Sequence, residues 1–336
     1  MKIKRKEWTL LTVLLLFQGL AGCSGGPEPL PERHFREDMR MFVTGISAWA
    51  KFQNSEFKII PQNGVELFTL NGEHDGEPAA AYLNAIDGQG QEDLYYGYTG
   101  DGLRTPAEAT ARLEGFLDIA ARHGVKVLVT NYVKGNSPAA RQRADDARAR
   151  SRLKGYLNFS APSRGLDCAP EYPDPLNGTP AGNIVSLNDA GNFLYLINPD
   201  EQHDSKAAFL SAVMNTNYDL VLIDPYYEGE ALLPEDVTAL KTKAGGGRRL
   251  VIAYMSIGEA EDYRYYWHSE WDTAPPAWLG AENPRWKGNY KVEYWNRDWQ
   301  DIIFGSAESC LGRILSQGFD GVYLDIVDAF EYYEQF

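Results

Sequence analysis

The fold class is decided by residues 220–256, which read LVLIDPYYEGEALLPEDVTALKTKAGGGRRLVIAYMS. The two ends of this stretch, Leu220–Asp224 and Leu250–Met255, are short apolar runs that contain β-branched residues. Between them a helical pattern starts near Pro234, and three consecutive glycines at 245–247 indicate a turn. Continuous apolar strands of this kind are buried on both faces, which is typical of a parallel sheet covered by helices. The stretch therefore predicts a strand, a helix and a second strand of an α/β protein.

The same alternation extends over the rest of the chain. Further strongly apolar runs are Phe57–Pro61, Val125–Thr130, Phe193–Asn198 and Gly321–Val327. Weaker strand candidates are Leu94–Tyr98, Tyr156–Ser160 and Lys291–Trp295. Four further segments have helical patterns: about Phe35–Phe52, Thr105 to Gly124, Ser137 to Gly155, and about Trp299–Gln317. The second of them begins with a capping box at Thr105–Glu108. About eight strands that alternate with helices over roughly 300 residues predict a (β/α)8 TIM barrel rather than an open doubly wound sheet.

The order of the predicted elements is unusual for such a barrel. The first element, Phe35–Phe52, is an amphipathic helix, and the last strong element, Gly321–Val327, is a strand with only a short tail after it. A barrel with this order has its termini at a strand-to-helix junction. We therefore predict a circularly permuted (β/α)8 barrel.

The first 22 residues have the pattern of a secretory signal. A basic start precedes an apolar run from Trp8 to Leu20, which is too short and too one-sided for a stable transmembrane helix. The sequence Leu20-Ala21-Gly22-Cys23 resembles the bacterial lipobox, in which the cysteine is acylated, although an ordinary signal peptide can also contain a cysteine by chance. Ser24 resembles the residue found at this position in lipoproteins sent on to the outer membrane.

These features predict three parts of the chain. We expect residues 1–22 to be a removed lipoprotein signal, residues 23–34 to be a tether, and residues 35–336 to form a single barrel domain. A lipid on Cys23 would then hold the barrel in the bacterial cell envelope, outside the cytoplasm and more readily at the outer than the inner membrane.

The composition limits the class of protein and its partners. With 44% hydrophobic and 24% charged residues the chain is ordinary globular, which excludes a disordered or fibrous protein. The formal net charge of −15 argues against nucleic acid and anionic membrane surfaces as partners, and it suits a cationic substrate. Zinc-ligand spacing, a phosphate-binding loop and a complete dinucleotide fingerprint are absent, so we expect no metal and no cofactor. An oxidising compartment would permit a bridge between Cys168 and Cys310, a pairing that the sequence leaves open.

Polar side chains follow several of the predicted strands at the point where each strand ends. They are Asn63, Asn131, Asn198, Asp224, Glu259 and Asp325. Catalytic groups of (β/α)8 barrels lie at this end of the strands, and carboxylates beside buried strands are costly unless they are paired or used. A helix cap or a salt bridge explains any single carboxylate, whereas several that converge on one mouth favour a functional site. Without a metal or nucleophile motif, these acids indicate glycoside hydrolysis by a carboxylate pair.

Aromatic residues are unusually frequent between Tyr263 and Trp299. Aromatic faces stack on sugar rings, so this segment supports a carbohydrate substrate, with Trp295 as a candidate contact. The alternative is a loop that packs its own aromatic side chains.

Three segments resemble the glycoside hydrolase family 114 barrels, which are described as endo-α-1,4-polygalactosaminidase or related proteins. They are YMSIGEAEDYR at 254–264, WLGAENP at 278–284 and GFDGVYLD at 318–325. Residues 57–64 and 86–98 resemble segments that follow the GVYLD strand in the usual order of this family, whereas here they precede it. The resemblance extends from about residue 36 to the end of the chain, and it too implies a circular permutation.

The resemblance also implies roles for particular residues. Asp325 would be the nucleophile and Glu92 the general acid/base of a retaining mechanism. The implied substrate-binding residues are Asp224, Glu259, Tyr254, Asn63, Tyr323 and Trp295. The implied substrate is an α-1,4-linked galactosamine polymer, whose free amines are ammonium ions that suit an acidic pocket. Fungal-type members have a glutamate two residues before the catalytic aspartate, where this chain has Tyr323. A catalytically inactive barrel that binds polysaccharide is therefore the alternative.

Overall fold

The computed structural model describes residues 33–173 and 182–335. The predicted signal segment, the predicted lipidation site Cys23 and nearly all of the predicted tether lie outside the described residues. Among the residues that are described, no helix combines the length and the apolar character needed to cross a membrane.

The main strands of the described chain form two parallel sheets. The larger sheet has the order β1-β15-β11-β8-β7, with bounds Lys58–Pro61, Gly321–Asp325, Leu250–Ser256, Leu220–Ile223 and Phe193–Leu196. The smaller sheet has the order β2-β5-β6, with bounds Gly88–Glu92, Lys126–Tyr132 and Leu157–Ala161. The predicted α/β class with parallel strands is therefore confirmed.

The two sheets approach each other at both of their edges. A single parallel bridge joins Gln62, just after β1, to Gly90 of β2, and the amide of Asn63 donates to the Gly90 carbonyl at 2.9 Å. At the other edge β6 and β7 are in contact without a hydrogen-bonded ladder. The strands thus follow one another in the order expected for a barrel, but no continuous ladder closes it, and barrel closure and permutation stay predictions.

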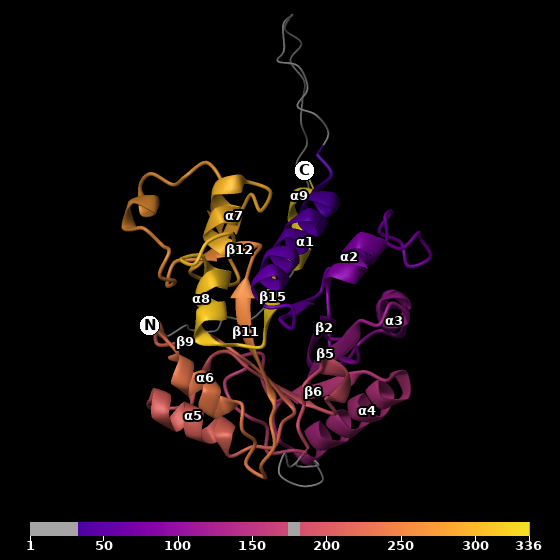
Figure 1. The fold of residues 1–336 in the computed structure, drawn as a ribbon. Helices are drawn as coiled ribbons and strands as arrows, with labels where there is room; N and C mark the ends of the chain where they lie inside the picture. The colour runs from indigo at the N-terminus through magenta and orange to yellow at the C-terminus, as the bar shows by residue number, and fades with distance from the viewer. Residues whose placement is uncertain (1–32, 174–181, 336) are drawn as a thin grey trace, which may run out of the picture.

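Helices lie outside the strands, with α3 and α4 on one side and α5 and α6 on another (Figure 1). The helix bounds are Phe35–Gln53 for α1, Ala80–Ala85 for α2, Ala107–Arg122 for α3, Pro138–Lys154 for α4, Lys206–Met214 for α5, Pro234–Leu240 for α6, Arg297–Ile303 for α7, Cys310–Gln317 for α8 and Phe330–Tyr333 for α9. The predicted amphipathic first helix is confirmed: Met39, Phe42, Val43, Ile46 and Ala50 of α1 are buried. Helices α1 and α9 lie side by side and are joined by the Arg36–Glu334 ion pair.

Short antiparallel elements occupy the loops that follow the parallel strands. They are β3 (Tyr96–Gly97) with β4 (Gly100–Arg104), β9 (Tyr226–Tyr227) with β10 (Glu230–Ala231), and the sheet β12-β14-β13 (Glu259–Glu261, Asn289–Val292 and Leu279–Glu282). The sequence prediction of strands at 94–98 and 291–295 therefore placed the hairpin strand β3 and the strand β14 approximately.

Three details of the sequence prediction are wrong. The predicted helix 299–317 is divided into α7 and α8, because Gly305 adopts φ 111° and Ser309 caps a new helix start. The predicted capping box fails because the Thr105 hydroxyl donates to the Asp93 carbonyl, at 2.6 Å, instead of capping α3. Strand β2 was missed because GQGQE contains no apolar residue.

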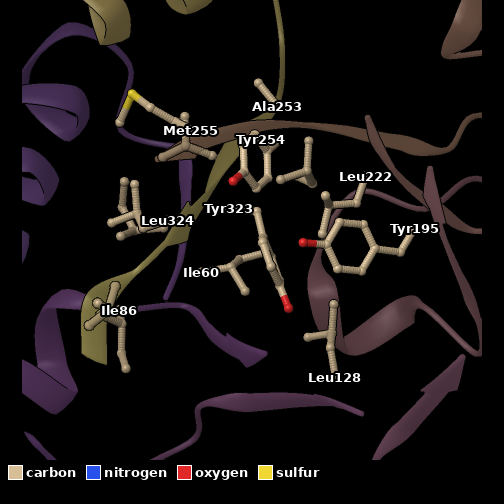
Figure 2. Close-up of a cluster of buried hydrophobic side chains, with 14 of the residues drawn as sticks. Ile60, Ile86, Leu128, Tyr195, Leu222, Ala253, Tyr254, Met255, Tyr323 and Leu324 are labelled. Carbon is tan, nitrogen blue, oxygen red and sulfur yellow. The ribbon is translucent and has the colours of Figure 1, made fainter. Parts of the chain in front are cut away.

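The inner faces of the strands carry tyrosines as well as aliphatic residues. Tyr323 of β15 pairs in register with Ile60 of β1 and Tyr254 of β11, and paired residues of a sheet share a face. Tyr195, Tyr254 and Tyr323 point into the space between the strands, whereas Leu324 lies on the opposite side of the β15 ribbon (Figure 2). This inner layer forms the floor beneath the polar strand ends.

Candidate active site

Glu92 and Asp325 lie at the carboxyl ends of β2 and β15, with β1 between these strands. Side chains two residues apart in a strand point to the same face. Glu92 therefore lies on the same face of β2 as Gly90, and Asp325 lies on the same face of β15 as Tyr323. A Cβ placed on Gly90 would lie 1.9 Å from the Tyr323 hydroxyl, which shows that those two inner faces meet. The structure therefore brings the two predicted catalytic carboxylates to one site.

Both carboxylate oxygens of Glu92 accept hydrogen bonds. The Asn63 Nδ2 donates to Oε2 at 3.2 Å, and the Tyr132 hydroxyl donates to Oε1. The Asn63 Oδ1 accepts the backbone N–H of Glu92 at 3.1 Å, which fixes the orientation of the amide so that its NH₂ faces the carboxylate. The structure therefore places Asn63 in contact with Glu92, and the second contact, Tyr132, was not anticipated from the sequence.

Asp325 has a second tyrosine as its partner. The Tyr254 hydroxyl donates to Oδ2 at 2.7 Å, and the backbone N–H of Ile326 donates to Oδ1 at 2.8 Å. Burial and the negative charge of Glu92 raise the pKa of Asp325 to about 7, although the Tyr254 hydroxyl opposes the rise. The influence of Glu92 on this pKa is further evidence that the two carboxylates are neighbours.

Residues next to the site have strained backbone conformations. Asn63, Asp93 and Ile326 adopt φ of 57°, 59° and 59°, in the left-handed region. Asparagine and aspartate tolerate this region, but a β-branched isoleucine does so at a cost of about 1–3 kcal/mol. The loop after β11 packs closely against this strained residue. A Cβ placed on Gly258 would lie only 2.1 Å from the Ile326 carbonyl oxygen.

The layer beneath the carboxylates contains buried hydroxyls. Tyr323 is fully buried, and its hydroxyl has no hydrogen-bond partner among the described residues; the same holds for the hydroxyl of Thr130, which pairs in register with Glu92. The Tyr195 hydroxyl donates to the Gln62 Oε1 at 2.9 Å. The predicted site residue Tyr323 thus lies directly below the carboxylates, on the floor of the site.

A third carboxylate, Asp328, was missed by the sequence analysis. It lies in the 3-10 turn Val327–Ala329, three residues beyond Asp325, and its backbone N–H is 3.4 Å from the Cβ position of Gly64. Burial, Asp325 and Glu92 raise its pKa well above the usual range. Within the described residues, none of Glu92, Asp325 and Asp328 forms an ion pair with a Lys, Arg or His.

Asp224, a predicted substrate-binding residue, forms an ion pair in the structure. The Arg264 guanidinium donates to both of its oxygens at 2.8 Å, and the Arg264 Nε also donates to the Glu261 Oε2 at 2.6 Å. The side chains of this ion-pair cluster are largely buried. Because both oxygens are engaged, Asp224 holds the loop after β8 against the loop after β11.

Glu259 and Trp295 lie in other surroundings. The fully buried Glu259 accepts hydrogen bonds at Oε1 from Lys291 Nζ at 2.5 Å and from Asn283 Nδ2 at 2.8 Å. The Trp295 ring packs against Phe35, with ring centroids 5.1 Å apart, and against other aromatic residues near α9. In the described chain neither residue contacts Glu92 or Asp325, so the structure gives neither a place in the carboxylate cluster.

Two further expectations concern metals and cysteines. The described residues contain no group of three or more His, Cys, Asp or Glu arranged to hold a metal ion. Cys168 and Cys310 are both free, so the bridge that the sequence left open is not formed, and the Tyr265 hydroxyl donates to the Cys310 sulfur at 3.6 Å.

The comparison with protein families concerns the second part of the chain. Residues 201–336 match the model of glycoside-hydrolase family GH114. This match supports the family resemblance for the part of the chain that includes Asp325, whereas Glu92 lies outside the matched residues.

Curated relatives match over similar lengths. An uncharacterized protein of Methanocaldococcus jannaschii is 48% identical over 158 residues, which cover 46% of this chain and 42% of the relative. Uncharacterized proteins of Thermotoga maritima and Deinococcus radiodurans are each 41% identical, over 37% and 36% of this chain and 36% and 37% of their own lengths. The chain therefore matches less than half the length of each relative.

Proposed function

We propose that this protein is a glycoside hydrolase that cleaves an α-1,4-linked, galactosamine-containing polysaccharide with Glu92 and Asp325 as its carboxylate pair. The observation that carries the proposal is the meeting of these two carboxylates at the ends of β2 and β15, on either side of β1, each with its own hydrogen-bond donors. The family match over residues 201–336 independently supports glycosidase chemistry. We further propose that the two parallel sheets make up a circularly permuted (β/α)8 barrel, and that a lipid on Cys23 anchors it in the bacterial envelope.

In the proposed reaction Asp325 attacks the anomeric carbon while Glu92 donates a proton to the departing glycosidic oxygen. The C–O bond to the leaving sugar breaks, and a glycosyl ester forms on Asp325. Glu92, now a carboxylate, takes a proton from water, which attacks the same carbon and releases Asp325. Retention of configuration requires the carboxyl groups to be about 5–5.5 Å apart, whereas inversion requires about 6.5–9.5 Å.

The charge of the site explains why a substrate amine would assist this chemistry. Burial and the charge of Glu92 raise the pKa of Asp325 to about 7, so the nucleophilic form of Asp325 is not fully populated at neutral pH without substrate. The 2-ammonium group of a galactosamine unit is adjacent to the anomeric carbon, and a cation close to Asp325 would lower the pKa of this carboxyl. Substrate binding would then favour the ionised, nucleophilic form of Asp325.

The same electrostatics favour an aminosugar over a neutral sugar. Glu92, Asp325 and Asp328 lie together without a basic ion-pair partner in the described chain, so a bound ammonium group gains attraction that a hydroxyl or acetamide does not. Asp328 thus contributes to the attraction of an ammonium group together with the catalytic pair.

The test is a reducing-end release assay with purified protein and a partly deacetylated α-1,4-linked galactosamine polymer. Asp325→Asn and Glu92→Gln are expected to abolish turnover while folding and polymer binding persist. The exposed residues Asp301 and Glu108 provide matched controls, because Asp301→Asn and Glu108→Gln make the same chemical changes on α7 and α3. Proton NMR of the first product formed reports the anomeric configuration, for which we expect retention.

The outcomes separate the two functions that the sequence leaves open. Release of reducing ends by the wild type, and not by the two site variants, supports the hydrolase. Binding of the polymer by an inactive wild type would instead indicate the polysaccharide-binding barrel. Full activity of both site variants would refute the assignment of Glu92 and Asp325.

A further inference from the structure

Glu92 is held by a tyrosine that is itself held by an arginine. Tyr132, the last residue of β5, is buried, and its hydroxyl donates to Glu92 Oε1. The Arg164 guanidinium carbon lies 4.0 Å from the centroid of the Tyr132 ring, which is a close cation–π contact. We propose that Tyr132 is a positioning residue for Glu92, and that Arg164 keeps the Tyr132 ring in place.

Arg164 is itself fixed by three acceptors. Its Nη2 donates to Asp93 Oδ1 and to the Gly97 carbonyl, and its Nε donates to Asp101 Oδ1, each at 2.7 Å. Asp93 directly follows Glu92 and has a left-handed backbone. Arg164, which lies in the loop after β6, therefore contacts Asp93 and the β3–β4 hairpin as well as the ring of Tyr132.

This arrangement suits positioning of a catalytic group rather than general stabilisation. The Tyr132 hydroxyl donates to one carboxylate oxygen of Glu92 and so fixes the orientation of the carboxylate. Asp325 has the equivalent arrangement with Tyr254 on the other side of the site. Each carboxylate thus has its own tyrosine, and each tyrosine belongs to a different strand of the fold.

The surroundings of Glu92 contain further titratable groups, which must stay unchanged in any test. They are Asp325, Asp328, Asp93, Tyr323 and Tyr195, each of which Glu92 influences electrostatically. Tyr132→Phe preserves all of them and the ring stacked on Arg164, and it removes only the hydroxyl.

The inference rests on the proposed role of Glu92, so its test has one part that needs no activity. In the full-length protein labelled with 13C at the glutamate carboxyl carbon, the Glu92 signal is identified by its loss in Glu92→Gln. Tyr132→Phe is expected to change the chemical shift of this signal at pH 7, because the hydrogen bond from the Tyr132 hydroxyl to the carboxylate is lost. Tyr156→Phe is the matched control: its hydroxyl donates to Asp118 at 3.0 Å, a carboxylate on α3.

The second part of the test uses turnover of the aminosugar polymer. Tyr132→Phe is expected to lower kcat about tenfold or more with KM changed less than about twofold, because a misplaced Glu92 affects the chemical step more than binding. Arg164→Met is expected to lower kcat as well, and Arg164→Lys to restore part of it, because lysine keeps the charge near Asp93 but not the planar stack on Tyr132. Arg297→Lys, at an exposed ion pair on α7, is the control.

The results separate failure of the inference from failure of the proposed function. A Glu92 carboxyl signal and a kcat that are both unchanged in Tyr132→Phe would overturn the positioning role. A changed Glu92 signal in Tyr132→Phe, together with a wild-type protein that releases no reducing ends, would support the positioning role and refute the hydrolase. A change of equal size in Tyr156→Phe would show a general effect of losing a tyrosine hydroxyl and would also overturn the positioning role.

Discussion

Replacing Gly90 with alanine tests how closely β2 and β15 pack beneath the two carboxylates. The added Cβ would lie 1.9 Å from the Tyr323 hydroxyl oxygen, 2.4 Å from its Cζ and 2.7 Å from its Cε2. Carbon atoms in contact prefer about 3.5–4.0 Å, so the ring or the strand has to shift by more than about 1 Å. Tyr323 is fully buried, and its ring centroid lies 5.2 Å from that of Tyr195, so little free space receives it.

Overpacking of a core typically costs about 1–3 kcal/mol, and the shortness of these contacts places Gly90→Ala near about 3 kcal/mol. The assay is urea unfolding followed by circular dichroism at pH 7. Gly182→Ala is the matched control, since a Cβ at Gly182 meets no atom within 4 Å. Because Glu92 is two residues beyond Gly90, a shift of β2 also displaces Glu92, and polymer hydrolysis is expected to fall with stability.

A double variant identifies the cause. Tyr323→Phe alone is expected to be nearly neutral, because the lost hydroxyl has no partner among the described residues. In the Tyr323→Phe background Gly90→Ala should cost about 1 kcal/mol less, since the nearest atom is gone while Cζ still lies too close. Equal costs in both backgrounds, or no cost at all, would refute the packing argument.

Two further predictions concern buried charge. Because the folded-state pKa of Asp325 is raised from 3.8 to about 7, its contribution to stability is fully present below pH 3.8 and is lost as the pH rises through 7. The free energy of unfolding in urea should therefore be higher for Asp325→Asn than for the wild type at pH 8, by at most about 4 kcal/mol, and equal for the two near pH 4. A difference that does not depend on pH would contradict this. Arg264→Met leaves Asp224 and Glu261 without their cation and should lose about 3–5 kcal/mol by the same assay, whereas Arg297→Met on the surface should lose less than about 1 kcal/mol.

The sequence predicts most of the architecture because most strands are apolar on both faces. Runs such as Leu220–Asp224 and Leu250–Met255 have no other stable place than a covered parallel sheet. Strand β2 is the exception. Position 90 needs a glycine to leave room for Tyr323, and the other positions of GQGQE are polar or glycine too, so the strand has no apolar residue. Hydrophobicity therefore fails for the strand that carries Glu92, and only the family resemblance indicated this residue.

The partners of the site residues were harder to predict than the residues themselves. Asn63 and Tyr254 were named as site residues, yet nothing in their spacing shows that they donate to Glu92 and Asp325. Tyr132 and Arg164 come from separate strand ends and meet only in three dimensions. Asp224 has the same sequence context as Asp325, a carboxylate after an apolar strand, and only the position of Arg264 distinguishes an ion pair from a free group.

The division of the parallel strands into two sheets has a mechanical consequence. Glu92 belongs to the smaller sheet and Asp325 to the larger one. On this side the Gln62–Gly90 bridge and the backbone hydrogen bonds from Asn63 to Gly90 and from Asp87 to Ile59 connect the two sheets. The separation of the carboxylates therefore depends on how the two sheets pack, and not on one continuous ladder. Inserting a residue between Pro61 and Gly64 would displace one sheet relative to the other and change the distance between the two acids, with every reacting side chain still present.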